Sequence, residues 1–277
     1  HRFLKPHHPY RRLKKTFNES QEHETAPIPL TGEQVFQWVQ HLNTIFGKTQ
    51  KKDKSKTCIW KKMSIFFDLP YWFDLDIRHC IDVMNVEKNV CDSVIGTLLN
   101  IQGKTKDGLN THQDLADIGI RSQLHLRSDG KKIYLPPACH TLSRWEKMSF
   151  CQCLRRVKVP HGYSSNIKSL VQLKDIKLVG LKSHNCHVLM QQLLFVAIRD
   201  IFPNKVKLAI TRLCFFFNAI CSKVLDPVKL DELENEVVII LCELEMYFPP
   251  AFFDIMVHLI VHLVREIKCC DPVYLRW

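Results

Sequence analysis

The sequence predicts a mainly α-helical protein with a minor β component. From residue 184 onward, apolar side chains recur every three or four positions through four successive segments, as in helices that bury one face. The aromatic, β-prone segment 58–72 predicts a short strand. With 277 residues, 46% of them hydrophobic, and 9 glycines, the composition excludes a disordered chain, a collagen repeat and a membrane bundle.

The N-terminal part of the chain predicts an arm followed by two helices. Residues 1–34 are rich in proline, histidine and charge with little periodicity, so we expect a basic extended arm. Thr31 is placed to cap a short helix that runs to Phe46. An amphipathic helix is expected over residues 83–99, with Asp82 at its N-cap.

The C-terminal part predicts a helical domain. Residues 102–165 carry many glycine, proline and Asp-Gly turn signals, so we expect loops and a domain boundary there, with a linker at 136–165. The helical domain then covers residues 166–277. Its four helices are expected at residues 188–202, 205–225, 229–248 and 252–268.

Short catalytic signatures are missing from this sequence. It contains no GxxxxGK[ST], GxGxxG, GxSxG or HExxH, so no small-molecule substrate is expected. The twelve cysteines lack the two-residue gap of a zinc knuckle, which favours ordinary packing in a reducing compartment. His184, Cys186 and His187 precede a helix and are expected to cap it. The apolar run 255–264 is about half a membrane span, so no membrane partner is expected.

One face of the last helix is a candidate metal site. Asp254, His258 and His262 are spaced four residues apart, and Arg265 falls on the same stripe. Two imidazoles one turn apart can share a metal ion. The alternative, which the sequence alone favours, is that this stripe is the solvent face of an ordinary amphipathic helix.

Two carboxylates are candidates for phosphodiester chemistry. Catalysis with two metal ions needs several acidic ligands that converge from separate elements, and Asp82 and Glu245 are the nearest candidates. The plainer alternatives are that Asp82 only caps a helix and that Glu245 is a surface charge at the margin of a buried face.

The basic residues of the N-terminal region form a candidate nucleic-acid surface. Residues 1–62 hold 13 basic and 5 acidic side chains, and aromatic residues are interleaved with them. Such a surface neutralises phosphates with little sequence preference; the alternative is an ordinary solvated charge run. The candidate residues are Arg11, Arg12, Lys14, Lys15, Lys51, Lys52 and Lys54.

Long runs spread over nearly the whole chain carry a family resemblance. They are HRFLKPHHPYRR, APIPLTGEQV, FDLPYW, RHCIDVMNVEKNVCDSVIGTLLNI, YLPPACHTLS, LKSHNCHVLMQQLL, ITRLCFFFNAICSKVLDPVKLDELENE and LEMYFPPAFFDIMVHLIVHLVREI. These runs resemble the transposase of plant CACTA (En/Spm-like) DNA transposons. The resemblance implies a nuclear protein with a partial RNase-H-like transposase core over residues 35–135, followed by a helical domain of unknown function over residues 166–277.

The resemblance also implies metal chemistry. The family holds divalent metal with an Asp, Asp, Glu triad, and both aspartates are expected before residue 1. The glutamate is expected beyond residue 277 or, in a competing assignment, at Glu245. The family's Asp-x-x-His motif here reads Asp82 to Asn85, and by similarity these two residues face His258 and His262 as four ligands of a structural zinc ion. Magnesium is expected only with a complete triad.

Three hypotheses follow from these patterns. The leading one is a transposase-derived fragment without independent catalysis that retains contact with DNA. The second is an active or domesticated metal-dependent transposase or nuclease whose site includes Asp82 and Glu245. The third is a protein-interaction module built on the helical domain. Cleavage of DNA separates the second from the others, and salt-dependent DNA retention separates the first from the third.

Overall fold

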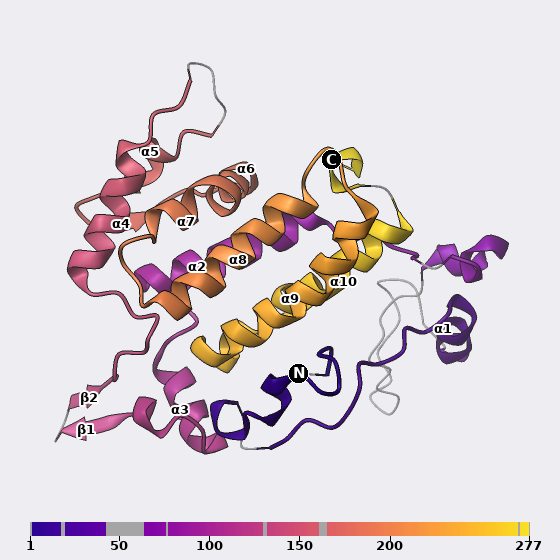
Figure 1. Cartoon of the computed structure of the whole chain (residues 1–277), viewed down its shortest axis with the longest axis horizontal. Coiled ribbons are helices and arrows are strands. Elements are labelled where there is room, and N and C mark those ends of the chain that lie inside the picture. Colours follow the sequence, from indigo (N-terminus) through magenta and orange to yellow (C-terminus); the bar gives the residue numbers. More distant parts are fainter. Residues whose placement is uncertain are drawn as a thin grey trace, which may run out of the picture. The chain divides into compact units, whose positions relative to one another are not determined.

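The structure is a computed structural model that describes residues 2–17, 20–42, 64–75, 77–129, 132–160, 165–270 and 272–276. It is mainly helical, which confirms the mainly α part of the predicted fold class (Figure 1). The chain divides into two compact units. Unit 1 comprises residues 1–26 and 81–277, and unit 2 comprises residues 27–80.

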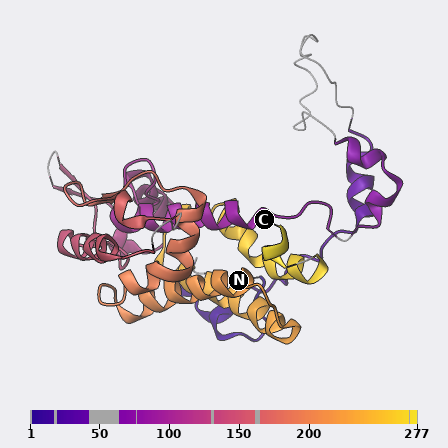
Figure 2. The same ribbon diagram turned by 90° about the horizontal axis from the view of Figure 1, so that it is seen from above.

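Unit 1 is a helical bundle whose core is formed mainly by long helices. Its helices are α2 (Val83–Leu99), α3 (Leu109–Ile118), α4 (Arg144–Arg156), α5 (Ile167–Leu170), α6 (Ser183–Val188), α7 (Leu194–Ala197), α8 (Asn204–Ile220), α9 (Pro227–Tyr247) and α10 (Ile255–Cys269). Helix α9 packs against α8 and α10, and α2 packs against α6 and α10 (Figure 1, Figure 2). Phenylalanines from the helices and from the turn after α9 fill much of the core, and Phe150, Phe216, Phe217, Phe248 and Phe252 are almost fully buried.

Helix α2 begins as the sequence predicts. The Asp82 carboxylate accepts a hydrogen bond from Asn85 N at 2.9 Å, which satisfies one free donor of the first turn. The helix ends at Asn100, which adopts the left-handed conformation at φ 53°. Gly96 lets the following loop pass close to the helix, since a Cβ there would lie 2.8 Å from the Lys104 carbonyl oxygen.

The strands of the described chain form two small antiparallel hairpins. In one, β1 (Arg127–Asp129) pairs with β2 (Lys132–Tyr134), and in the other, β3 (Val171–Gln172) pairs with β4 (Lys177–Leu178). This is the minor β component that the sequence predicts, although neither hairpin lies where the strand was expected. The RNase-H-like character of residues 35–135 stays an expectation from the resemblance.

Two helices occupy the region for which the sequence predicts loops. Residues 109–118 form α3 and residues 144–156 form α4, so the loop prediction is wrong at both places. Helix α4 starts with a capping box, in which the Ser143 hydroxyl accepts from Glu146 N and the Glu146 carboxylate accepts from Ser143 N.

A π-helical turn, Leu189–Leu193, joins α6 to α7. The predicted continuous helix over residues 188–202 is therefore wrong in detail: the helical path starts earlier, widens at the π turn and ends at Ala197. The last two predicted helices are confirmed as α9 and α10. No helix in the described ranges is long and apolar enough to cross a membrane.

The described residues of unit 2 form one α-helix and two 3-10 helices. Helix α1 (Gly32–Val39) starts with a capping box between Thr31 and Gln34, as the Thr31 cap predicts, and it ends before the expected Phe46. The strand expected over residues 58–72 is wrong for its described part, which forms 3-10 helices at Ile65–Asp68 and Pro70–Phe73. Ser64 caps the first of these, Pro70 starts the second, and the Phe66 and Trp72 rings stack at 4.9 Å, so the aromatic groups pack locally rather than along a strand.

Candidate functional site

A buried carboxylate lies at the centre of unit 1. Glu87 follows Val83 by one helical turn, so α2 turns it toward the core together with Val90. It is 1% exposed. A glutamate buried this deeply needs close polar partners, because burial without them strongly disfavours its charge.

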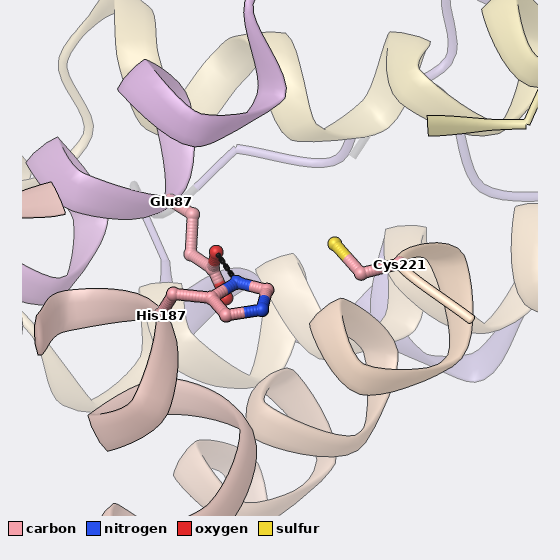
Figure 3. Close-up of side chains that lie close together, drawn as sticks. All are labelled: Glu87, His187 and Cys221. Carbon is pink, nitrogen blue, oxygen red and sulfur yellow. Dashed lines mark hydrogen bonds and ion pairs between the residues drawn. The ribbon is translucent and has the colours of Figure 1, made fainter. Parts of the chain in front are cut away.

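The partners of Glu87 come from α6, the π turn and the end of α8. The His187 Nδ1 atom lies 2.7 Å from Glu87 Oε2, and Gln191 Nε2 lies 3.1 Å from Glu87 Oε1. Cys221, the C-cap of α8, brings a thiol to the same place (Figure 3). We call Glu87, His187, Gln191 and Cys221 the Glu87 cluster.

The Glu87 cluster offers three kinds of metal ligand. Within the part of the chain that the structure describes, Glu87, His187 and Cys221 are the group of three or more His, Cys, Asp or Glu residues whose ligand atoms all lie within 4.8 Å of one another. Burial and the nearby Glu87 charge raise the pKa of the Cys221 thiol to about 12, so the thiol keeps its proton at neutral pH. His187 and Cys221 are only half-buried, which leaves the cluster accessible from solvent.

A second buried cluster lies beyond the C-terminal end of α2. The two Asp107 carboxylate oxygens lie 2.8 Å from His112 Nε2 and 3.0 Å from His140 Nε2. The Nδ1 atoms of the same rings lie 2.5 Å from Leu124 O and 2.9 Å from Tyr247 O. We call Asp107, His112 and His140 the Asp107 cluster. It ties α3 and the segment before α4 to the end of α9.

The Asp107 cluster favours charge on both its carboxylate and His140. Burial opposes the charged form of His140, but hydrogen bonds to Asp107 and Cys139 and the Asp107 charge outweigh it and raise the pKa of His140 to about 9. Burial likewise opposes ionisation of Asp107, but hydrogen bonds and charge from His140 and His112 lower its pKa. Stacking on Phe248 at 4.9 Å fixes the His140 ring.

The four predicted zinc ligands are brought together only in part. His258 and His262 meet on α10, with their Nε2 atoms 3.3 Å apart, and the Phe3 ring packs against both. Asp82 and Asn85 are exposed at the start of α2, and among the described residues Asp82 forms no three-ligand group with the two histidines. Burial, His258 and Arg265 lower the pKa of His262. The four-ligand zinc site stays a prediction.

The two predicted catalytic carboxylates have different surroundings. Asp82 is exposed and serves as the N-cap of α2. Glu245 is half-buried on α9, where burial raises its pKa and the Arg121 charge acts in the opposite direction. The Arg121 guanidinium donates to the backbone carbonyls of Glu245 and Phe248, which closes the C-terminal end of α9.

The predicted nucleic-acid residues divide into three groups. For Arg11 the prediction is corrected, because this residue is only 4% exposed. Its guanidinium donates to the backbone carbonyls of Arg2, Leu4, Glu22 and Glu24. It therefore holds the arm together and is not available to a phosphate. Arg12, Lys14 and Lys15 are exposed on two successive 3-10 helices. Lys51, Lys52 and Lys54 lie outside the described residues.

The Glu87 and Asp107 clusters were not predicted from the sequence. His187 was expected to act as a helix cap, and this is wrong: Asn185 provides the side-chain hydrogen bond at the start of α6, by accepting from Lys182 N at 3.0 Å. The available signal for the Glu87 cluster is the charged residue on the valine-rich face of α2. For Asp107, His112 and His140, the sequence offers no spacing that joins them.

Comparisons with known proteins identify one matching segment. A comparison with curated proteins gives no match, and neither does one with solved structures. Residues 220–277, which contain α9 and α10, match the family model described as a domain of unknown function, DUF4218.

Proposed function

We propose that this chain is a nuclear fragment derived from a CACTA-type DNA transposase that contacts DNA through basic residues and does not cut it unaided. The observation that carries the proposal is the match of residues 220–277 to the DUF4218 family model. That segment lies within the helical domain which, by resemblance, follows a CACTA transposase core.

The roles of the candidate carboxylates support a non-catalytic fragment. Asp82 uses its carboxylate to cap α2, and burial raises the pKa of Glu245, which makes ionisation of this carboxyl group less favourable than in water. Two-metal cleavage needs several ionised carboxylates that share the ions. We therefore expect magnesium binding only when the other carboxylates of the triad are present.

The basic surface of the arm supports contact with DNA. Arg12, Lys14 and Lys15 are exposed on consecutive short turns, and the buried Arg11 keeps the arm in this shape. Each cation that meets a phosphate releases a counterion, so binding must weaken as salt rises. The charge pattern gives no sequence preference, which fits a surface that holds DNA without selecting a site.

The test is the salt dependence of binding to a labelled DNA duplex, measured by fluorescence anisotropy. A variant with Arg12, Lys14 and Lys15 changed to Gln should bind more weakly, with a log–log salt slope lower by about 3. The matched control changes the exposed lysines Lys168, Lys174 and Lys205 to Gln and should retain the wild-type slope. Absence of salt-dependent binding favours the protein-interaction module, and nicking of the duplex with magnesium or manganese favours the nuclease; either result contradicts the proposal.

A further inference from the structure

With Glu87 ionised, the contacts within the Glu87 cluster are not all compatible with hydrogen bonds. His187 Nδ1 lies 2.7 Å from Glu87 Oε2 and 2.9 Å from Gln191 Nε2, while Gln191 Nε2 lies 3.1 Å from Glu87 Oε1. If Nδ1 carries a hydrogen, it donates that hydrogen to the carboxylate. The hydrogens of the Gln191 NH2 group then have no lone pair on Nδ1 to donate to. If it carries none, it accepts from the amide, but its lone pair then faces the carboxylate.

A divalent cation removes this conflict. Rotation of the Gln191 amide by 180° exchanges its nitrogen and oxygen, a choice that side-chain positions alone do not fix. Glu87, His187 and Cys221 each offer one ligand atom, and these atoms lie within 4.8 Å of one another. After the rotation, the Gln191 amide oxygen lies beside the Glu87 carboxylate and His187 Nδ1. A cation bound among these groups is attracted to each of them, whereas a single hydrogen atom bridges only two.

We propose that Glu87, His187 and Cys221 bind a zinc ion, with the Gln191 amide oxygen as the fourth ligand. Imidazole nitrogen, thiolate sulfur and carboxylate oxygen are the ligands that zinc takes, and four is its usual number in structural sites. One carboxylate and one thiolate neutralise the Zn²⁺ charge. Because the thiol is protonated in the free protein, binding releases its proton to solvent, about one for each zinc bound.

The geometry fits a structural ion. The ligand atoms of Glu87, His187 and Cys221 already lie within 4.8 Å of one another, and zinc bonds of roughly 2.0–2.3 Å require only small side-chain rotations to close around it. The three residues come from α2, α6 and the end of α8 (Figure 3), so the ion would cross-link α8 to the directly packed pair of α2 and α6.

The experiment measures metal binding by the whole chain after chelator treatment. Zinc is titrated in competition with a chromogenic chelator, and cobalt is titrated as an optical substitute that shows a sulfur-to-metal charge-transfer band when a thiolate binds it. We expect one zinc for each chain and a cobalt–thiolate band. Cys221→Ser should abolish the band and weaken zinc binding at least about tenfold, while Cys269→Ser, an exposed thiol, should change neither.

Two further variants keep the test decisive. Glu87→Gln retains the shape of the side chain and should stay folded by circular dichroism while zinc binding weakens at least about tenfold. A double His258→Ala and His262→Ala variant should retain full zinc affinity, which separates this site from the histidine pair of α10. The proposal is overturned if wild-type protein binds no zinc, or if zinc binding survives Cys221→Ser and Glu87→Gln but is lost with the histidine pair.

Discussion

The two buried clusters of unit 1 both pair a carboxylate with histidine but differ in how hydrogen atoms fit between their groups. In the Asp107 cluster every ring nitrogen of His112 and His140 faces an oxygen, so a ring that carries two protons has an acceptor for each N–H. In the Glu87 cluster one ring nitrogen faces both a carboxylate and an amide NH2 group. Burial of a carboxylate with histidine is therefore not enough to indicate an ion site. Close contacts that an ionised carboxylate cannot satisfy through hydrogen atoms make the Glu87 cluster the better candidate.

The largest expected effect comes from removing the carboxylate of the Asp107 cluster. Asp107→Ala leaves two buried imidazoles without their shared acceptor and should lower the free energy of unfolding by roughly 4 kcal/mol. Urea denaturation measures the change. Asp114→Ala, at an exposed position of α3, is the control and should stay within about 0.5 kcal/mol of wild type. Equal effects of the two substitutions would contradict a structural role for the Asp107 cluster.

The same cluster should make stability depend on pH. The pKa of His140 is raised from 6.5 to about 9 in the folded protein, so the folded state binds its proton more tightly than the unfolded state does. The resulting stabilisation, about 3 kcal/mol, is complete below pH 6.5 and is lost as the pH rises to about 9. Unfolding free energies at pH 6.5 and 9.5 measure it. His140→Gln should reduce the difference between the two values, and an unchanged difference would assign the effect to other groups.

Arg11 extends the comparison to a buried cation that backbone carbonyls alone satisfy. Arg11→Ala removes hydrogen bonds to Leu4, Glu22 and Glu24 and should cost about 2 kcal/mol, less than Asp107→Ala because the arm can loosen locally. Faster proteolysis of the arm is the most direct measurement. The neighbouring Arg12→Ala, at an exposed position, should leave both stability and proteolysis unchanged. Equal sensitivity of the two variants would show that Arg11 does not hold the arm.

The smallest expected effect, that of Glu87→Gln, distinguishes the two clusters most directly. In the presence of a chelator, Glu87→Gln removes a buried charge, and the new amide can donate to His187 and accept from Gln191. We therefore expect Glu87→Gln to leave the unfolding free energy unchanged or to raise it by less than about 1 kcal/mol. Asp107→Asn, by contrast, should clearly lower the unfolding free energy. Denaturation of both variants with and without zinc measures this. A loss of several kcal/mol in chelator would mean that hydrogens already satisfy the Glu87 cluster.

Much of the helical fold follows from single residues at helix ends. Thr31, Asp82 and Asp226 each accept hydrogen bonds at the start of the helix that the sequence predicts. The Ser143 and Glu146 pair has the same kind of signal, although turn residues on both sides favoured a loop prediction for α4. The strand prediction at 58–72 fails in its described part because aromatic propensity does not provide a neighbouring strand to pair with.

The candidate sites depend on contacts that no local pattern provides. His187 follows Glu87 by 100 residues, and only the packing of α6 on α2 brings them together. By contrast, the spacing of His258 and His262 on one helix predicts their contact correctly, because both lie on the same face of α10. Local periodicity thus predicts pairs within a helix, while sites assembled from several helices require the tertiary structure.

The π turn at Leu189–Leu193 makes the length of this segment matter more than its composition. A π turn holds one residue more than the α-helical path it replaces. Losing that residue would rewind the segment as ordinary helix and rotate everything on one side of it by about 100° relative to the other. His187 and Phe195, which flank the turn, could not then both keep their present neighbours. This short segment should therefore tolerate the substitution of one apolar residue for another far more readily than a deletion.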